Sequence, residues 1–313
     1  MKRECLAVIA AIRSQPWAIL PEYLEAIEAI AARAMESDIL KMLAGDGHAA
    51  QFASSVSAVA AVGERLEGSQ LSTLRNGAAV VPILGAIYPR SNMAVASAGG
   101  TALDAIMRDF RVAQASVDVD RIVLLVDSPG GVVSGLGEAA EAIRASTKPV
   151  TAFVTGMGAS AAYWLLSGAS EVVLDRGAQV GSIGVLATTS RQEGPDQNGR
   201  RSIEIASSGA PMKRPDMDTD EGRASIQAEI DAVEAVFVAD VAAGRRVTAE
   251  RVLAEFGRGA MVSADRAVRA GMADRIGTLE SVLSQGSGRT QPMTGGRRAL
   301  AAAQIETRRR AAL

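Results

Sequence analysis

The stretch VTAFVTGMGASAAYWLLSGAS, residues 150–170, decides the fold. Its apolar start indicates a buried strand, two glycines then turn the chain, and Ser160 opens a short helix. In that position the Ser160 hydroxyl lies at the strand end, in the positive field of a helix N-terminus that favours a developing oxyanion. A serine there is also an ordinary helix N-cap, so the segment alone supports either a nucleophile or a cap.

An upstream stretch, RIVLLVDSPGG at 121–131, has a related pattern. An apolar strand runs directly into Pro129, Gly130 and Gly131, which stop the strand and leave backbone N–H groups free to bind a ligand. Such donors suit an oxyanion hole. A simple tight turn between strand and helix explains the same residues equally well.

Short apolar runs alternate with helical stretches from residue 78 onward, which predicts an α/β body with right-handed crossovers and a largely parallel sheet. We predict three regions: an N-terminal helical segment and connector over 1–76, the body over 77–283, and a flexible Arg-rich tail over 284–313. Outside the strands AAVVPIL, RIVLLVD and VTAFV, the expected helices lie near 21–36, 51–67, 101–114, 133–146 and 219–243. Further strands are expected near 171–174, 181–187 and 201–207.

The base that would activate Ser160 can be sought by elimination. His48, the single histidine, lies in the connector, which makes a Ser-His-Asp triad an unfavourable interpretation. Arginine does not act as a base near neutral pH, whereas a desolvated lysine can. Of the four lysines, Lys2 and Lys41 precede the body, Lys148 stands beside a proline at a helix end, and Lys213 remains. A solvated loop lysine is the alternative for Lys213.

The bulk composition excludes several other classes of protein. The 313 residues carry a net charge of -2, which does not favour nucleic acid or an anionic membrane. Cys5 is the single cysteine, so no internal disulfide or structural zinc site is expected. The apolar run over 6–12 is too short for a membrane span, and we predict a cytoplasmic protein without metal or cofactor.

Five short blocks occur in order along the body: DSPGG (127–131), ASAAYW (159–164), GSIGV (181–185), SSGAPMK (207–213) and RAGMADRIG (269–277). Their order and spacing resemble the signal peptide peptidase A family of serine peptidases, peptidase family S49. The N-terminal PWAILPEYLEAIEAI at 16–30 further resembles the start of phage capsid assembly proteases that act inside proheads.

The resemblance implies a ClpP/crotonase-like fold, a spiral of β-β-α units, and common assembly into homo-oligomers. It implies that Ser160 is the nucleophile, Lys213 the general base, and Ser182 the hydroxyl that orients the lysine amine. The oxyanion donors would be the backbone N–H of Gly130 or Gly131 and that of Ala161. The implied substrates are proteins or peptides, in phage members scaffold, capsid or portal proteins, cut in the prohead interior.

Three alternatives remain at the level of sequence. One is a cytoplasmic protein like the signal peptide peptidases, and another is a crotonase-like enzyme, which would need acidic catalytic residues and a coenzyme A site. The third is an inactive capsid-associated scaffold, since Lys213 stands one residue farther along than the usual family spacing. In that case Arg297, Arg298 and Arg308 to Arg310 could form a docking arm rather than a disordered tail.

Overall fold

The computed structural model describes residues 16–25, 27, 62–90, 100–188, 194 and 206–284. The Arg-rich tail from residue 285 on, the connector residues 28–61 and residues 201–205 of the strand expected over 201–207 lie outside the described residues, as do Cys5 and His48. Residues 206–207, which are described, do not form a strand.

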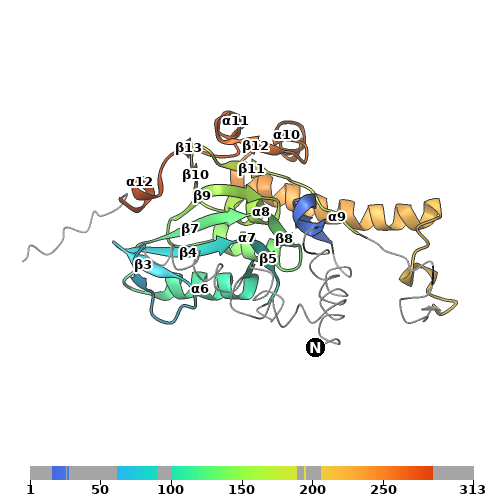
Figure 1. Ribbon diagram of the computed structural model, residues 1–313, viewed down its shortest axis with the longest axis horizontal. Helices are drawn as coiled ribbons and strands as arrows, with labels where there is room; N and C mark the ends of the chain where they lie inside the picture. Colours follow the sequence, from blue (N-terminus) through green and yellow to red (C-terminus); the bar gives the residue numbers. More distant parts are fainter. Residues whose placement is uncertain are drawn as a thin grey trace, which may run out of the picture.

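A large, mostly parallel sheet forms the centre of the body, as the alternation of strands and helices predicts (Figure 1). Strands β4, β7, β9 and β10 pair in parallel because helices cross over between them. The spatial order is β12 (Met261–Ser263), β11 (Gln179–Gly181), β9 (Val150–Ala159), β7 (Arg121–Ser128), β4 (Ala78–Leu84), β3 (Thr73–Arg75) and β2 (Glu64–Arg65), with β10 (Glu171–Leu174) between β9 and β13 (Arg275–Ile276).

A second, smaller sheet lies beside the ends of these strands. Its order is β1 (Trp17–Ile19), β8 (Gly130–Val132), β5 (Ala86–Tyr88) and β6 (Gly100–Ala102). The chain passes from β4 to β5 and β6 and then into helix α6, and from β7 to β8 and then into α7. This repeated passage through large sheet, small sheet and helix is the β-β-α spiral, and it confirms the ClpP-like fold expected from sequence.

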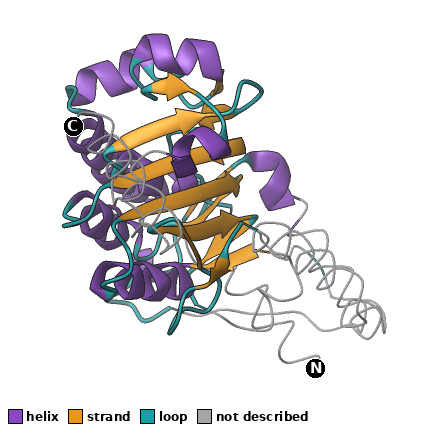
Figure 2. Cartoon of the chain, turned by 90° about the vertical axis from the view of Figure 1, so that its left-hand side faces the viewer, coloured by secondary structure: helices purple, strands orange, loops and turns teal. Residues whose placement is uncertain are grey.

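Helices stack along the strands (Figure 2). Residues 21–25 and 27 are helical, and a 3₁₀ turn covers Pro211–Lys213. The remaining helices are α6 (Leu103–Ala115), α7 (Leu136–Arg144), α8 (Ala161–Ser167), α9 (Asp220–Arg245), α10 (Ala249–Glu255), α11 (Ala264–Ala270) and α12 (Leu279–Ser284).

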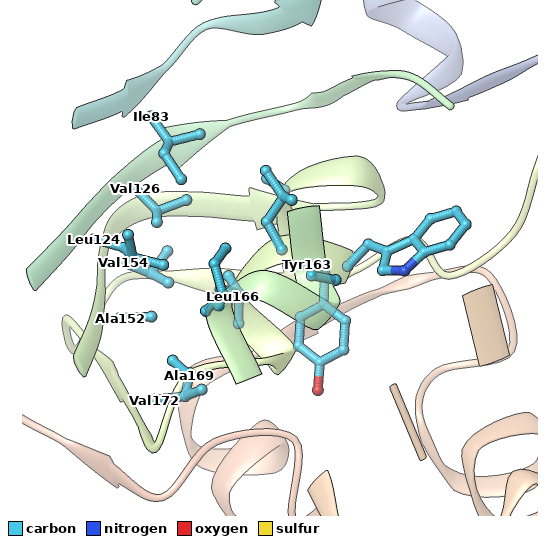
Figure 3. Close-up of a cluster of buried hydrophobic side chains, with 14 of the residues drawn as sticks. Ile83, Leu124, Val126, Ala152, Val154, Tyr163, Leu166, Ala169 and Val172 are labelled. Carbon is cyan, nitrogen blue, oxygen red and sulfur yellow. The ribbon is translucent and has the colours of Figure 1, made fainter. Parts of the chain in front are cut away.

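The two faces of the large sheet bury two separate sets of side chains, because successive strand residues point to opposite faces. One face, with Leu124 and Val154, packs against α6, α7 and α8 in the main core (Figure 3). The other face, with Leu125 and Phe153, packs against Leu283 of α12. Both faces are therefore covered, which explains why β4 and β7 are apolar without alternation.

Helix α9 is half exposed. Thr219 caps it, accepting a hydrogen bond from the Gly222 N–H at 3.0 Å. After Gly222, the first buried side chain is Phe237, so about 26 Å of helix precedes the packed half at 1.5 Å per residue. The exposed half extends beyond the rest of the body, and the described residues before it lie at its far end (Figure 1).

Two elements differ from the sequence prediction. Residues 62–67, expected to end a helix, instead form a turn and strand β2, and β2 and β3 join the large sheet through β4. The buried carboxylate of Asp109 holds this hairpin by accepting hydrogen bonds from the N–H groups of residues 70–72. The strand expected over 181–187 ends at Gly181, because Ser182 has a positive φ of 52°.

Candidate active site

Ser160 stands in a sharp turn between β9 and α8. Its φ of 51° and ψ of -115° lie in a region that residues other than glycine rarely adopt. The Ser160 N–H donates to the carbonyl of Gly181 at 2.7 Å, so strand β11 helps to hold the turn. Strain of this kind persists only where the surroundings impose it, and it is concentrated at functional sites.

The helix that follows Ser160 is fixed from two sides. Tyr163 donates its hydroxyl hydrogen to the Met272 carbonyl at 3.0 Å, and burial raises the pKa of this tyrosine far above its usual range. The neighbouring Trp164 stacks on Phe237 with ring centroids 4.4 Å apart and donates to Asp240 at 2.8 Å. All seven residues of α8 are buried, so the turn that carries Ser160 has little freedom to move.

The hydroxyl of Ser160 is buried and has no hydrogen-bond partner among the described residues. A buried hydroxyl without a partner is destabilising, and each such group in a native protein calls for an explanation. A hydroxyl kept free to attack a substrate is one such explanation. The structure therefore brings Ser160 to the predicted position and leaves its oxygen available.

Of the residues predicted to supply oxyanion donors, Gly130 and Ala161 lie beside Ser160, and the Gly130 N–H donates to Ser128 Oγ at 3.2 Å. Gly130 has a φ of 105°, and a Cβ added there would lie 3.0 Å from Ser160 Cβ, which requires glycine at this point. A Cβ added to Gly131 would overlap the backbone of Ile87. Ala161 is the first residue of α8, so its N–H has no partner within the helix.

Ser182 lies on the strand next to the nucleophile. Strands β9 and β11 pair Ala159 with Gly181, and Ser160 and Ser182 each follow directly after that pair. Ser182 is nearly buried, and its N–H donates to the Ala260 carbonyl at 3.1 Å. The structure thus places Ser182 beside Ser160, as an orienting hydroxyl would need to be.

Lys213 is not brought to this site in the described structure. It is exposed at the end of the 3₁₀ turn, seven residues before α9 begins. Ser160 Oγ has no hydrogen-bond partner, so the lysine amine does not contact it. Lys148, the other lysine of the body, donates to the carbonyls of Ala113 and Ser116 and so has a structural contact.

A cleft of about 340 Å³ opens beside Ser182. One wall is the segment 182–186, the opposite wall is the middle of α9, and α10 closes the base. Its lining mixes apolar side chains with the carboxylates Asp231 and Glu234.

Strand β1 is the part of the site that the sequence analysis missed. It pairs antiparallel with β8, and Trp17 exchanges two backbone hydrogen bonds of 2.8 Å with Leu186. Ala18 is fully buried beside Gly130. The only signal in the sequence was the short apolar run after Pro16, which is too brief to indicate a strand with a distant partner.

Within the residues that the structure describes, no cluster of His, Cys, Asp and Glu has the size needed to hold a metal ion. In the same residues, none of the helices is both long and apolar enough to cross a membrane.

Comparison with known families agrees with this geometry. The model of peptidase family S49 matches residues 142–288, which include Ser160, Ser182 and Lys213. Residues 142–288 are thus similar to peptidase family S49. A model of the Clp proteases also matches residues 81–176, which include Gly130 and Gly131.

Two phage proteins are similar to this chain. Capsid assembly protease C of Escherichia phage lambda is 28% identical over 253 residues, which are 79% of this chain and 57% of that protein. Head-tail preconnector protein GP5 of Enterobacteria phage P21 is 28% identical over 214 residues, or 67% of this chain and 42% of that protein. The chain therefore spans about half the length of these relatives.

Among solved structures, a membrane-bound stomatin-specific protease in complex with a substrate peptide aligns at a TM-score of 0.40 and 18% identity. The alignment covers 65% of this chain and 76% of that one.

Proposed function

We propose that the chain is a serine endopeptidase whose nucleophile is Ser160. The observation that carries this proposal is the free, buried hydroxyl in a strained turn, next to glycine amides and the first amide of α8. Such an arrangement serves acyl transfer, because it presents a nucleophile and oxyanion donors to the same carbonyl group. The match of residues 142–288 to the model of family S49 supports the same chemistry.

In the proposed reaction, Ser160 Oγ attacks a peptide carbonyl carbon while a neutral lysine amine accepts the hydroxyl proton. The amides of Gly131 or Gly130 and of Ala161 stabilise the oxyanion, and the lysine then protonates the departing amine. Water hydrolyses the acyl enzyme by the same route in reverse. No metal or organic cofactor takes part.

Lys213 is the proposed base and Ser182 the proposed orienting hydroxyl. Since Lys213 lies on an exposed segment, its amine must approach Ser160 when substrate binds or when the protein assembles. Partial desolvation at the buried site would then lower the pKa of the lysine and favour its neutral form.

The proposed biological role is prohead maturation, with scaffold, capsid or portal proteins as substrates of a homo-oligomeric protease. The names of the two phage relatives support this role. A catalytically inactive scaffold of the same fold is the second candidate, and the exposed position of Lys213 away from Ser160 favours it.

The test is intact mass measured over time for the wild-type chain, alone and mixed with candidate capsid and scaffold proteins. We expect cleavage by wild type and by Lys148→Ala, and none by Ser160→Ala or Lys213→Ala. Loss of cleavage in Ser160→Ala alone would assign the base elsewhere. If wild type cuts no candidate protein, the inactive scaffold is the better description.

A further inference from the structure

Strand β1 lies where a peptide would have to lie in order to reach Ser160. It runs between β8, which carries the two glycines, and Leu186 on the opposite side. An extended chain held on both sides by backbone hydrogen bonds is the usual way in which a strand is bound in a groove. The residues of β1 are buried, so they also close the route from solvent to the hydroxyl.

The register of β1 identifies the carbonyl group nearest to the oxyanion donors. Leu20 N–H donates to Pro129 at 3.0 Å, and Val133 N–H donates to Pro16 at 3.4 Å. Hydrogen-bonded pairs alternate along an antiparallel ladder, so the bonded pair between these two is Ala18 with Gly131. The Ala18 carbonyl oxygen therefore faces the Gly131 amide.

The same carbonyl group lies beside the nucleophile. A Cβ added to Gly130 would overlap the Ala18 carbonyl oxygen on one side and lie 3.0 Å from Ser160 Cβ on the other. The Ala18 carbonyl group and Ser160 Cβ therefore both lie next to the space that is left open because Gly130 has no Cβ. The Ser160 hydroxyl, which has no hydrogen-bond partner in the described residues, is in the same place.

We propose that residues 16–20 are a built-in substrate strand and that the protein cuts its own Ala18–Ile19 bond. This inference rests on the proposed peptidase function and names a substrate of that same site. The small side chain of Ala18 fits the closed space beside the glycines. Trp17 holds the strand in register, since it is buried with its ring 6.4 Å from that of Tyr88, edge to face.

The reaction is a hydrolysis. Ser160 Oγ bonds to the Ala18 carbonyl carbon, the bond to the Ile19 nitrogen breaks, and the proton from the hydroxyl passes through the base to that nitrogen. Water then attacks the ester, restores the serine and leaves a carboxylate on Ala18. The products are residues 1–18 and a chain that begins with the free amine of Ile19.

Cleavage also opens the site. After cleavage, residues 1–18 are held to β8 and to Leu186 by backbone hydrogen bonds. Because the covalent bond to Ile19 is gone, this segment can dissociate. We therefore expect the uncut chain to act on an added peptide more slowly than the cut one. Peptide hydrolysis should begin with a lag that ends as the Ile19 amine appears.

The experiment follows the intact mass and the N-terminal sequence of the full chain over time, at several protein concentrations. The probe in the same samples is a quenched fluorescent peptide with the sequence of residues 16–21. Wild type should acquire Ile19 as its N-terminus, at a rate that does not depend on concentration, whereas Ser160→Ala stays intact. Ala18→Asp, which places a charge in the closed space, should leave residues 1–18 attached and yet hydrolyse the probe without a lag. Val117→Asp adds the same charge at an exposed position and should behave as wild type.

The possible failures are distinct. Hydrolysis of the probe or of any added protein by a wild-type chain that keeps residues 1–18 would overturn the self-cleavage and leave the peptidase function intact. Absence of all hydrolysis in wild type and in Ala18→Asp would overturn both. Cleavage at Ala18 that persists in Ser160→Ala would show a contaminating protease and overturn the inference.

Discussion

Ser160 bears two local features that oppose folding, its positive φ and its buried hydroxyl without a partner. A buried polar group left unsatisfied costs about 1–3 kcal/mol. Replacing Ser160 with alanine removes that group and keeps the backbone, so we expect the free energy of unfolding to rise by about 1 kcal/mol while peptide hydrolysis is lost. Urea unfolding monitored by circular dichroism measures the change.

Ser167 supplies the matched control for this substitution. It is equally buried at the other end of α8, but its hydroxyl donates to the Trp164 carbonyl at 2.7 Å. Ser167→Ala should therefore leave stability unchanged or lower it. A loss of stability in Ser160→Ala as large as that in Ser167→Ala would argue against a free hydroxyl at position 160.

Gly131 is confined by the backbone of Ile87 on the neighbouring strand. Gly131→Ala would force β8 away from β5, and overpacking of this kind costs about 1–3 kcal/mol. The displaced amide could no longer face a substrate carbonyl, so hydrolysis of a peptide should fall together with the urea midpoint. Gly209→Ala is the control, because nothing lies within 4 Å of a Cβ there, and it should change neither quantity.

At the scale of elements, Asp109 joins helix α6 to the β2–β3 hairpin. Its carboxylate is almost fully buried and accepts hydrogen bonds from three consecutive backbone N–H groups and from the Ser72 hydroxyl. Asp109→Ala leaves those donors unpaired, and we expect a loss of roughly 3 kcal/mol in the free energy of unfolding. Arg108→Ala on the exposed face of α6 should cost far less, and equal losses would contradict the role given to Asp109.

Asp274 links the C-terminal end of α9 to β10. Burial raises its pKa, but hydrogen bonds from Arg245 and from the Val172 N–H outweigh burial and hold the pKa below its usual range. A lowered pKa in the folded state stabilises the protein above the ordinary aspartate pKa of about 3.9 and ceases to do so as the pH falls through the lowered value.

The consequence is a pH-dependent difference between wild type and Asp274→Asn. Near neutral pH, wild type should have a higher urea midpoint than Asp274→Asn. The difference between the two midpoints should become smaller as the pH is lowered toward about 3. Glu229→Gln, which alters an exposed carboxylate of α9, should show no comparable trend. A gap that stays constant with pH would indicate that Asp274 acts through packing rather than through charge.

A helix or strand can be predicted from sequence when the residues that stabilise it are close to it along the chain. Strands β4, β7 and β9 are long apolar runs, and α9 has a capping threonine, so both are evident from neighbouring residues. The turn at Ser160 is local as well. By contrast, β1 is three residues long and exists because distant residues pair with it, and the hairpin at 64–75 depends on Asp109, which lies dozens of residues away. The position of Lys213 depends on how α9 packs, which no local pattern encodes.

At the scale of the whole molecule, the buried apolar residues fall into a large core, a second set on the other face of the large sheet, and a small separate cluster around β1. The small cluster contains Trp17, Ile19, Leu24, Ile27, Ala86, Tyr88 and Val132. With so few members it should open before the main core does, because local opening is easiest where little apolar surface is buried.

Trp17 reports this opening in the uncut chain, since the chain has two tryptophans and Trp164→Phe, made in the inactive Ser160→Ala protein, leaves Trp17 as the only one. In that variant we expect the emission maximum to shift to longer wavelength at a lower urea concentration than the loss of helical circular dichroism. Coincident transitions would mean that β1 and the main core unfold as one unit.

The contact between Trp164 and Phe237 connects the exposed half of α9 to the turn that carries Ser160. Phe237 stands at the first buried turn of a rigid rod, and the stacked Trp164 is four residues from the nucleophile. A force applied near Asp220 would be transmitted along the helix to its contact with α8, because the exposed half of α9 is long and only the other half is packed. A partner that grips the free end and tilts it slightly would apply torque to the turn at Ser160, so the orientation of the hydroxyl would respond to assembly at a surface far from the site.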